Sequence, residues 1–386
     1  MLISYPTRFE TFGAVKFYEV SRVYSLFSIG AEGRPGAFTL ANFRDFEEVA
    51  SSTVFVVPVK DEEPILLEGV LRAIPSLSPI VVVSASSRYP LNMYRVELDI
   101  ARSVYKTSER TIVVVHQKDK VLSEELAKHI PEITDEEGYV RYGKGEGLLI
   151  GTLIADALRA SNVAFVDADN FIPSTVLEYS LIYYTTLGLS ESKFKMTRIY
   201  WGYKAWSTEE LYFRRLGRVS AIVNSVLNRV LSLRRRMETD IIKTANSGEH
   251  AMSIELAKII TYGGGYSVET QELVSILELC YIDMEEKCPA LPENIEIFQV
   301  ESRSPHVHSE KGEAHVAQMM IESLSTTYYS RLPDERGRAY IEQTIRDMGY
   351  ETPPPRVPKY KYPDIDSKRF LDTILSESRN ALALGI

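Results

Sequence analysis

Four apolar runs, separated by stretches with helical periodicity, restrict the possible folds of this chain most strongly. The runs are TVFVVPV (53–59), PIVVVSA (79–85), TIVVVH (111–116) and VAFVDAD (163–169). Apolar runs of this length without polar alternation are typical of strands buried on both faces. The helical patterns that follow or separate them cover 65–74, 91–105, about 123–129 and 148–160. We therefore predict an α/β domain with a mostly parallel, doubly wound sheet and right-handed crossovers.

The composition of the chain is that of an ordinary globular protein with one large core or two domains. It has 386 residues, of which 45% are hydrophobic and 25% are charged. The net charge of -9 argues against sequence-independent nucleic-acid binding, which depends on neutralising phosphates. No apolar run approaches the length of a membrane span, and the N-terminus lacks the features of a signal peptide. Cys280 and Cys288 are too few for a disulfide framework, so we predict a protein of the reducing cytoplasm, without membrane or nucleic-acid partners.

We divide the chain into three parts. An N-terminal segment (1–50) is expected to pack on a main domain (51–330), and residues 331–386 form a linker and a helical tail. The proline-rich stretch ETPPPRVPKYKYP opens the tail, and a helix is predicted near 366–382. Within the main domain, Ser207 and Glu210 have the spacing of a capping box for a long amphipathic helix, whose apolar face starts at Leu211 and which ends on Arg234–Arg236.

The fourth apolar run ends on Asp167-Ala168-Asp169, followed by Asn170 and Pro173. Two carboxylates two residues apart on an extended segment point the same way and raise each other's pKa. A divalent cation between them would remove this repulsion, and the alternative is a strand end with solvated acids. Because ligands of doubly wound sheets gather beyond the carboxyl ends of the strands, we predict a ligand site here.

The other strand ends carry polar residues that belong at the same edge of the sheet. They lie in Pro58–Glu63, Ser84–Arg88 and His116–Lys118, which together suggest a pocket for a nucleotide base and ribose. Tyr142–Gly147 is a glycine-rich turn that opens a helix, an arrangement that suits an anion. Gly138 to Lys144 matches the start of a Walker A motif. However, Gly145 stands where Ser or Thr should follow, and an acidic loop precedes the motif, so we reject an NTPase.

An apolar strand into P-V-x-D-E, a G-K-G before a helix and a strand into D-A-D resemble the nucleotide-sugar glycosyltransferases of the GT-A fold. More specifically, FVDADNFIP, YGKGEG, ANSGEHAMS (245–253) and ESRSPHVHSEKGEAH (301–315) look like landmarks of the mannosyl-3-phosphoglycerate synthase family. The resemblance extends from about residue 10 to 330, and Ser174 departs from it where a glycine is expected. It implies a GT-A fold with a C-terminal helical extension.

The resemblance also implies an activity, which is transfer of mannose from GDP-mannose to 3-phosphoglycerate with retention at the anomeric carbon. The product would be mannosyl-3-phosphoglycerate, the precursor of the compatible solute mannosylglycerate. A divalent metal, Mg²⁺ first and Mn²⁺, Co²⁺ or Zn²⁺ as alternatives, and a homodimer are expected. Two other hypotheses stay open: an inverting GT-A mannosyltransferase with another acceptor, such as a polyprenyl phosphate, and a non-catalytic nucleotide-sugar sensor.

In the donor half (51–170), we predict that Glu62 accepts the guanine N–H groups and that Lys144 lies near the pyrophosphate or sugar. The full set of predicted donor-binding residues is Pro58, Lys60, Glu62, Ser84, Arg88, Gln117, Lys144, Asp167 and Ala168. The predicted catalytic residues are Asp167, Asp169 and Glu249. Asp169 and His308 are the predicted metal ligands, because imidazole suits a divalent cation beside carboxylates. The resemblance favours His308 over His306.

In the acceptor half (171–330) and its border, we predict that Arg141, Arg218 and His250 bind the acceptor. 3-Phosphoglycerate brings about three negative charges, and arginine binds phosphate and carboxylate oxygens bidentately. The alternative for Arg218 is a solvated helix face. The alternative for His250 is a packing role.

Overall fold

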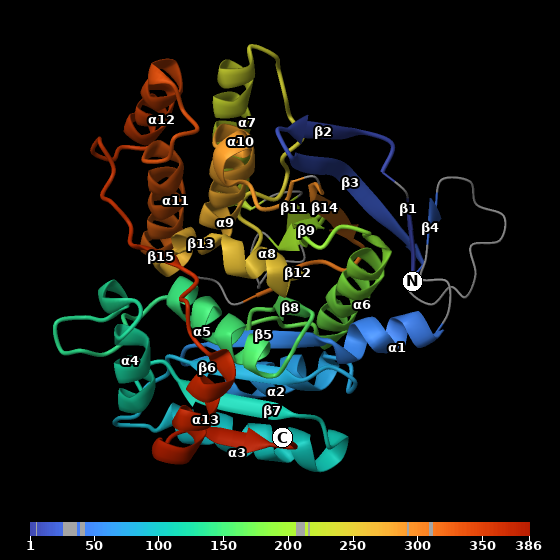
Figure 1. The fold of residues 1–386 in the computed structure, drawn as a ribbon, viewed down its shortest axis with the longest axis vertical. Coiled ribbons are helices and arrows are strands. Elements are labelled where there is room, and N and C mark those ends of the chain that lie inside the picture. Colours follow the sequence, from blue (N-terminus) through green and yellow to red (C-terminus); the bar gives the residue numbers. More distant parts are fainter. Residues whose placement is uncertain are drawn as a thin grey trace.

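The computed structural model describes residues 1–4, 6–25, 37–38, 43–205, 213–214, 217–291, 293–308 and 312–386. Its described strands form one large sheet of twelve strands and two small sheets of two (Figure 1). The order in the large sheet is β16-β7-β6-β5-β8-β12-β9-β14-β3-β1-β4, and β2 pairs with β3.

The first half of the sheet contains the four predicted strands, and they are parallel to one another. These are β5 (Thr53–Val59), β6 (Ile80–Ser84), β7 (Ile112–His116) and β8 (Asn162–Phe165). The chain moves outward from β5 to β7 and then returns to the other side of β5 at β8, so a topological switch point lies between β5 and β8. Ligands bind outside the carboxyl ends of the strands at such a point.

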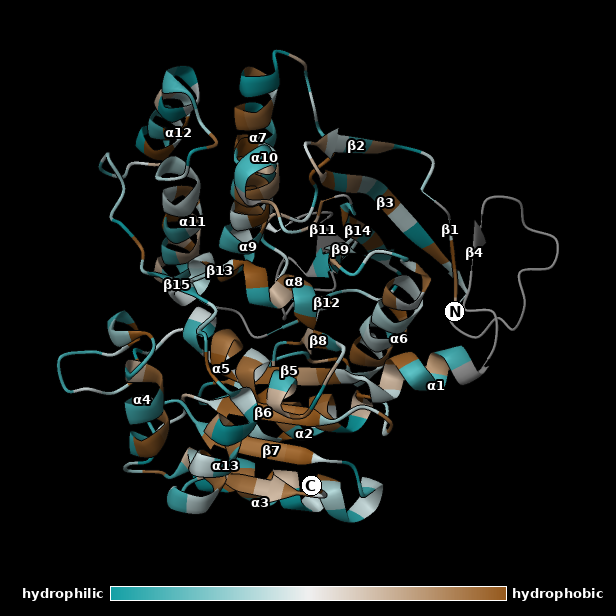
Figure 2. Ribbon diagram, in the orientation of Figure 1, coloured by the Kyte–Doolittle hydropathy of each residue, from teal (hydrophilic) through white to brown (hydrophobic). Residues whose placement is uncertain are grey.

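The strands of this half are buried on both faces, as predicted. Val54 and Val56 of β5 belong to a core that also contains Leu148 and Leu153 of α5. Phe55 faces the opposite way, into a second core that contains residues of α2, α3 and α6. Figure 2 shows β5, β6 and β7 as mainly hydrophobic strands. The helices of this half are α1 (Phe43–Ser51), α2 (Pro64–Ala73), α3 (Met93–Ser108), α4 (Lys120–Ala127), the 3₁₀ turn η1 (Pro131–Ile133), α5 (Lys144–Ala157) and α6 (Pro173–Leu189).

The second half of the sheet contains a reversal that the sequence analysis did not predict. Strand β12 (His250–Ser253) runs antiparallel to both of its neighbours, β8 and β9 (Lys195–Trp201). Its first residue, His250, pairs with Phe165, the last residue of β8. The segment before β12 therefore lies beside the segment after β8, which brings Gly248-Glu249 next to Asp167.

The remaining elements complete this half of the sheet and cover it with helices. Strand β14 (Ile295–Ser302) is parallel to both β9 and β3 (Val15–Ser25). The other strands are β1 (Leu2–Ser4), β2 (Phe9–Phe12), β4 (Ala37–Phe38), β10 (Lys204–Ala205), β11 (Phe213–Arg214) and β13 (Thr261–Gly263). The helices are α7 (Arg218–Arg235), α8 (Ile254–Ile259), the 3₁₀ turn η2 (Gly265–Ser267), α9 (Val268–Leu277), the π-helical turn η3 (Glu278–Ile282), α10 (Met284–Lys287), α11 (Glu313–Tyr328) and α12 (Glu335–Asp347).

The C-terminal tail is attached to both halves of the molecule. It contains β15 (Lys359–Lys361), α13 (Ser367–Glu377) and β16 (Leu382–Leu384). Strand β15 pairs with β13, α13 packs against α5 and α4, and β16 extends the large sheet antiparallel to β7. The C-terminus accordingly lies near α3 and β7 in Figure 1.

The predicted α/β fold of GT-A type with a C-terminal extension is confirmed. Two details differ from the sequence prediction. Strand β8 ends at Phe165, so Asp167 and Asp169 follow the strand rather than belonging to it. The described part of the long helix begins at Arg218, and the proposed capping box, Ser207 and Glu210, lies with Leu211 outside the described residues. None of the helices in the described ranges has the length and apolarity needed to cross a membrane.

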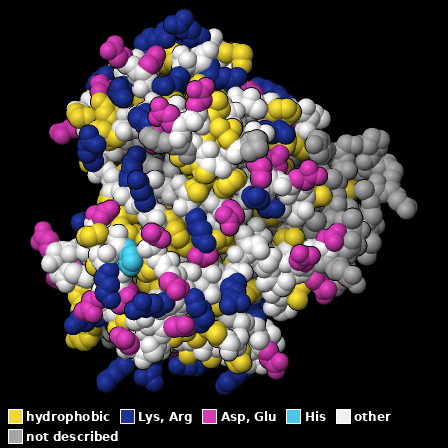
Figure 3. Space-filling view, in the orientation of Figure 1, with side chains coloured by type: hydrophobic (Ala, Val, Ile, Leu, Met, Phe, Trp, Pro, Cys, Tyr) yellow, Lys and Arg dark blue, Asp and Glu magenta, His cyan; other side chains and the backbone are white. Residues whose placement is uncertain are grey.

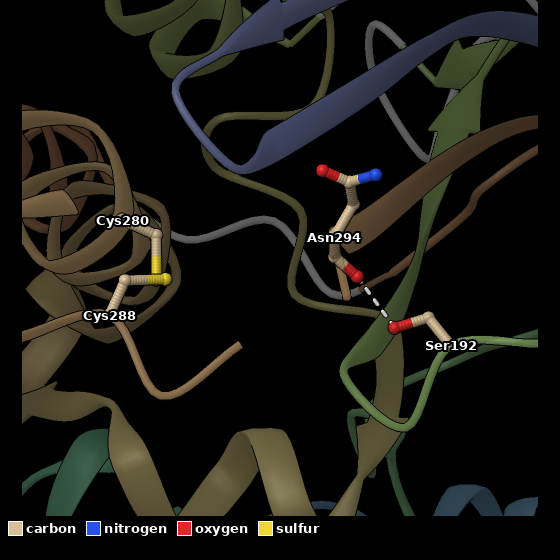
Figure 4. The surroundings of a disulfide bond; sticks show 4 residues. All are labelled: Ser192, Cys280, Cys288 and Asn294. Carbon is tan, nitrogen blue, oxygen red and sulfur yellow. Dashed lines mark hydrogen bonds between the residues drawn. A yellow bond between two sulfur atoms is a disulfide. The ribbon is translucent and has the colours of Figure 1, made fainter. Parts of the chain in front are cut away.

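Cys280 and Cys288 form a disulfide, which we did not predict (Figure 4). The π-helical turn η3 and the end of α10 bring their Cα atoms to 4.7 Å, within the range that a disulfide spans.

Figure 3 shows acidic and basic side chains interspersed over the visible face of the molecule.

Candidate active site

A cavity of about 340 Å³ opens at the carboxyl ends of β5, β6 and β8, at the switch point of the sheet. We call its two sides the first wall and the second wall. The first wall is lined from segments 58–62, 83–85, 142–147 and 167–169 and by Gln117. The second wall is lined by Trp201, Lys204, Asn246 and Gly248 and from segments 265–269, 306–308 and 315–319.

Seven of the nine predicted donor-binding residues line this cavity. They are Pro58, Lys60, Glu62, Gln117, Lys144, Asp167 and Ala168. Ser84 does not, because it is the last residue of β6 and is buried, with its Oγ accepting the N–H of Ser86 at 3.1 Å. Arg88 is exposed, and its guanidinium lies 5.7 Å from the ring centre of Tyr94, outside the lining.

Gln117 shapes the glycine turn rather than only facing the cavity. Its Nε2 donates to the carbonyl of Arg141 at 2.6 Å and to that of Gly143 at 3.1 Å. The side chain of Arg141 turns the other way, and its Nε donates to the carbonyl of Glu132 at 3.2 Å. Arg141, predicted to bind the acceptor, is therefore absent from the cavity lining; its backbone carbonyl anchors Gln117.

Lys144 links the two walls. Its Nζ lies 2.6 Å from Asp167 Oδ1 and 2.9 Å from Glu269 Oε1. Burial alone would lower the pKa of Lys144, but Asp167, Glu269 and Glu249 outweigh it and raise this pKa well above its ordinary value. Gly248 permits the contact, since a Cβ at that position would lie 2.7 Å from Asp167 Oδ2. The lysine therefore stays charged at the centre of the cavity.

Glu249 lies behind the wall and not in it. Its side chain is fully buried, and Oε1 accepts from Asn170 Nδ2 at 3.2 Å. Asn170 also donates to the carbonyl of Asp167 at 2.8 Å, which ties Glu249 to the acidic motif. Burial, reinforced by the charge of Asp167, raises the pKa of Glu249 above its usual range. Its Oε2 makes no hydrogen bond with the described residues. Glu249, predicted to be catalytic, thus supports Asp167 from behind in this geometry.

Backbone pairing brings the predicted metal ligands to one side of the cavity. Asn170 forms an isolated antiparallel bridge with His308, and the N–H of Phe171 donates to the carbonyl of Val307 at 3.0 Å. Both Asp169 and His308 line the cavity. The two residues come from segments about 140 positions apart, and this pairing is what places them together.

His306 also borders the cavity, but its ring is engaged by other side chains. It stacks on Trp201 with 4.4 Å between ring centres, and its Nδ1 lies 3.2 Å from the hydroxyl of Tyr179. Burial, followed by the charge of Lys204, lowers the pKa of His306 well below its ordinary value. These contacts hold the His306 ring in place and favour His308 as the ligand.

The donor set fits a divalent cation that also takes ligands from a substrate. Asp169 supplies carboxylate oxygen and His308 supplies imidazole nitrogen, both suitable for Mg²⁺ or a first-row transition metal. Over the part of the chain that the structure describes, no three His, Cys, Asp or Glu side chains converge on one point. The remaining ligands would then be phosphate oxygens and water, as is usual for Mg²⁺ at phosphate sites.

A buried ion pair supports the second wall. The guanidinium of Arg198 is fully buried, 3.1 Å from Glu272 Oε2, and it also donates to the carbonyls of Thr244 and Glu269 at 2.9 Å each. Arg198 also donates to the carbonyl of Ser247 at 3.4 Å, so Thr244 and Ser247 tie it to the segment that contains the lining residues Asn246 and Gly248. His250 belongs to the same support, since its Nε2 lies 3.1 Å from Glu272 Oε1.

Two predicted acceptor residues are therefore not where the sequence analysis put them. His250 is fully buried behind the second wall, because it begins a central strand of the sheet. Arg218 starts α7 on the surface and pairs with Glu313. Neither lines the cavity.

The sequence analysis also missed polar residues of the second wall. Lys204, Asn246, Tyr266, Glu269, His315 and Gln318 all line the cavity. His315 lies within the stretch ESRSPHVHSEKGEAH, so attention to the third histidine of that stretch could have found it. Glu269 and Gln318 lie on helices and carry no local signal.

Comparison with known proteins identifies the family. A family model for mannosyl-3-phosphoglycerate synthases matches residues 5–374. The chain belongs to the mannosyl-3-phosphoglycerate synthase family. It is 42% identical over 389 residues to the mannosyl-3-phosphoglycerate synthase of Aeropyrum pernix and 38% identical over 397 residues to that of Pyrococcus furiosus. Both alignments cover 100% of each chain, and membership confirms the predicted enzyme class, a glycosyltransferase.

Solved structures resemble this member of the mannosyl-3-phosphoglycerate synthase family more distantly. A mycobacterial protein aligns with a TM-score of 0.50 and 19% identity over 78% of this chain and 82% of its own. Glucosyl-3-phosphoglycerate synthase from Mycobacterium tuberculosis, solved with Mn²⁺, UDP and phosphoglyceric acid, aligns with a TM-score of 0.48 and 19% identity, over 75% of this chain and 84% of that chain.

Proposed function

We propose that this protein transfers mannose from GDP-mannose to 3-phosphoglycerate, with retention at the anomeric carbon. The bond between the anomeric carbon and the diphosphate breaks, and a new bond forms from that carbon to the oxygen of the single hydroxyl of 3-phosphoglycerate, so that GDP and the hydroxyl proton are released. The family assignment supports both substrates. The observation that carries the proposal is that Asp167, Asp169, Lys144 and His308 meet in one cavity at the switch point of the sheet.

On the donor side, the first wall offers the groups that a guanine nucleotide needs. Glu62 is the carboxylate of this wall that we assign to the two adjacent N–H donors of guanine. Lys144, at the start of α5, combines a charged amine with the positive end of a helix, which together suit a diphosphate. We assign Lys60, Gln117 and Ala168 to the nucleoside and sugar.

A divalent cation would be held by Asp169 and His308. When bound, it would neutralise the diphosphate and stabilise its charge as the glycosidic bond breaks. The side chains themselves do the positioning: Lys144 keeps Asp167 in place through their 2.6 Å contact, and Asn170 fixes the backbone between the two acids. We propose Mg²⁺ as the natural ion.

On the acceptor side, the second wall supplies polar groups in place of the arginines that we predicted. Lys204 lies 4.5 Å from the ring centre of Trp201, and its ammonium is the cation of this wall that we assign to the acceptor phosphate or carboxylate. Asn246, His315 and Gln318 can donate further hydrogen bonds to these oxygens. Arg218, which pairs with Glu313 outside the cavity lining, remains a second candidate.

The experiment is an assay of the purified protein with GDP-mannose, 3-phosphoglycerate and Mg²⁺, with nuclear magnetic resonance of the product. We expect an α-linked product, because the donor is α-linked and the proposed reaction retains configuration. A β-linked product would favour the inverting alternative. Donor binding without turnover, in the presence of metal and acceptor, would favour the sensor.

We further propose that the protein acts as a homodimer, as the family resemblance implies, and that it works in the cytoplasm, as the sequence analysis predicts. Light scattering after gel filtration tests the first proposal, and cell fractionation tests the second.

A further inference from the structure

The C-terminal strap, residues 358–362, packs against two segments that line the cavity, although none of its own residues lines it. Strand β15 within the strap pairs antiparallel with β13, with Tyr360 opposite Tyr262 and Lys359 opposite Gly263. The N–H of Gly264 donates to the carbonyl of Pro358 at 2.9 Å, which continues this pairing. The strap therefore holds the strand that leads directly into Gly265 and Tyr266 of the second wall.

One buried carboxylate joins the strap to both walls. Glu146 Oε1 accepts the hydroxyl of Tyr360 at 2.8 Å, and Oε2 accepts the N–H of Gly265 at 3.0 Å. Glu146 is 2% exposed and Tyr360 is 0% exposed. No lysine or arginine of the described ranges forms an ion pair with Glu146. The hydrogen bonds from Tyr360 and Gly265 therefore replace the hydration that this carboxylate loses on burial.

The backbone around Glu146 is packed too tightly to move independently. A Cβ on Gly145 would lie 1.8 Å from the carbonyl oxygen of Gly263, so α5 and the strand β13 meet backbone to backbone. Lys144, next to Gly145, and Gly265, two residues after Gly263, both line the cavity. A shift of Glu146 is thereby transmitted to the lysine that we assign to the donor diphosphate.

We propose that Glu146 and Tyr360 are positioning residues, through which the C-terminal strap fixes the glycine turn and Lys144 for donor binding. This inference rests on the donor site proposed above. It gives the tail, for which the sequence analysis predicted only a linker and a helix, a role in the reaction without any contact to substrate.

The chain contains a matched control for this proposal. Tyr362 lies two residues along the same strap, and its hydroxyl donates to Asp156 Oδ2 at 3.1 Å. Asp156 is on the same helix as Glu146, ten residues later and so about 15 Å further along the axis. Tyr360→Phe and Tyr362→Phe each remove one hydroxyl that bonds a carboxylate of α5, but only the first bond lies at the glycine turn.

The test compares both variants with the wild type by calorimetric binding of GDP with Mg²⁺ and by steady-state kinetics. We expect Tyr360→Phe to weaken GDP binding and raise the KM for GDP-mannose by about tenfold, with the KM for 3-phosphoglycerate nearly unchanged. We expect Tyr362→Phe to leave GDP affinity and the KM values for both substrates within about twofold of the wild type. Its melting temperature should fall about as much as that of Tyr360→Phe. Equal effects of the two variants on GDP binding would overturn the proposal.

A second variant keeps the inference testable if Tyr360→Phe affects folding broadly. Glu146→Gln retains size but presents an amide donor to one of the two groups that now donate to it. In a double-mutant cycle on GDP affinity, the two changes should be non-additive, and strict additivity would contradict a shared role. GDP binding does not require turnover, so failure of the wild type to use 3-phosphoglycerate would reject the proposed function while still leaving the strap tested.

Discussion

Two buried carboxylates lie behind opposite walls of the cavity and are stabilised in different ways. Glu97 of α3 lies beside the Ser84 and Ser86 hydroxyls behind the first wall, and neither of its oxygens makes a well-formed hydrogen bond with the described residues. Glu272 of α9 lies behind the second wall and contacts both Arg198 and His250 at 3.1 Å. The first wall thus tolerates a buried acid that can hold a proton, whereas the second uses a buried acid to bind a cation.

This difference follows from how the walls are built. The first wall is formed by loops at the ends of parallel strands, whose positions are set by the sheet and its two apolar cores. The second wall contains the irregular segment 244–249, whose carbonyls bond the guanidinium of Arg198. Where regular pairing is absent, buried charge supplies the hydrogen bonds that fix the backbone.

We expect the largest effect when the buried ion pair between Arg198 and Glu272 behind the second wall is broken. Arg198→Met leaves Glu272 buried without its cation and frees the carbonyls of Thr244 and Glu269, so we expect a loss of about 3–5 kcal/mol in the free energy of unfolding. Urea denaturation measures it. Adding Glu272→Met should recover much of the loss, because no uncompensated charge remains. A loss below about 1 kcal/mol for the single variant would show that this wall does not depend on the pair.

The next effect concerns the edge of the first wall. Asp169→Ala removes the carboxylate assigned to the metal, so turnover should fall by about a hundredfold or more, with little change in melting temperature. Initial rates at saturating Mg²⁺ test this. Near-normal turnover would remove Asp169 from the site.

The third effect tests whether Glu97, the buried acid behind the first wall, holds a proton in the folded protein. Burial, with a smaller contribution from the charge of Asp61, raises the pKa of Glu97 to about 7. As the pH rises from about 4.5 to 7, the unfolded chain ionises this group while the folded protein keeps its proton, so stability falls by about 3 kcal/mol in total. Glu97→Gln should lack this loss. The difference in free energy of unfolding between the variant and the wild type, measured by urea denaturation at each pH, should therefore shift in favour of the variant as the pH rises across that range. Glu124→Gln, at an exposed position on α4, serves as the control. A constant difference between Glu97→Gln and the wild type would mean that Glu97 is ionised throughout.

A smaller effect compares the two histidines that border the cavity. His308→Ala should raise the half-saturating metal concentration by at least tenfold, by analogy with the losses seen on changing metal sites. His306→Ala should change it less but lower the melting temperature more, because its ring stacks on Trp201. Metal titration of activity and thermal melting distinguish the two, and the reverse order would exchange their roles.

The smallest effect tests base recognition on the first wall. Glu62→Gln keeps one acceptor for guanine but loses the charged pair of acceptors, so the preference for GDP-mannose over a UDP-sugar should fall by about three- to tenfold. The ratio of kcat/KM for the two donors measures this. Unchanged selectivity would indicate that backbone groups read the base.

The sequence by itself determined the first wall. Its strands are short, continuous apolar runs, and parallel strands place their carboxyl ends at one edge of the sheet. Local pattern was therefore enough to predict that Lys60, Glu62, Gln117, Lys144 and Asp167 lie together. Ser84 and Arg88 were misplaced because a continuous apolar run does not say which residues at or after the end of a strand face a cavity.

Apart from His306 and His308, which the sequence analysis had singled out, the tertiary structure decided the second wall and the role of the tail. Strand β12 reverses direction, and this reversal brings Glu249 behind the acidic motif and hides His250, although both follow the same glycine. Lys204, Glu269 and Gln318 reach the cavity only through packing between distant segments, for which a single sequence carries no periodic signal. The contact between Tyr360 and Glu146 spans 214 positions. Long-range pairings of this kind depend on how surfaces fit together, whereas the apolar strands follow from local hydrophobic pattern.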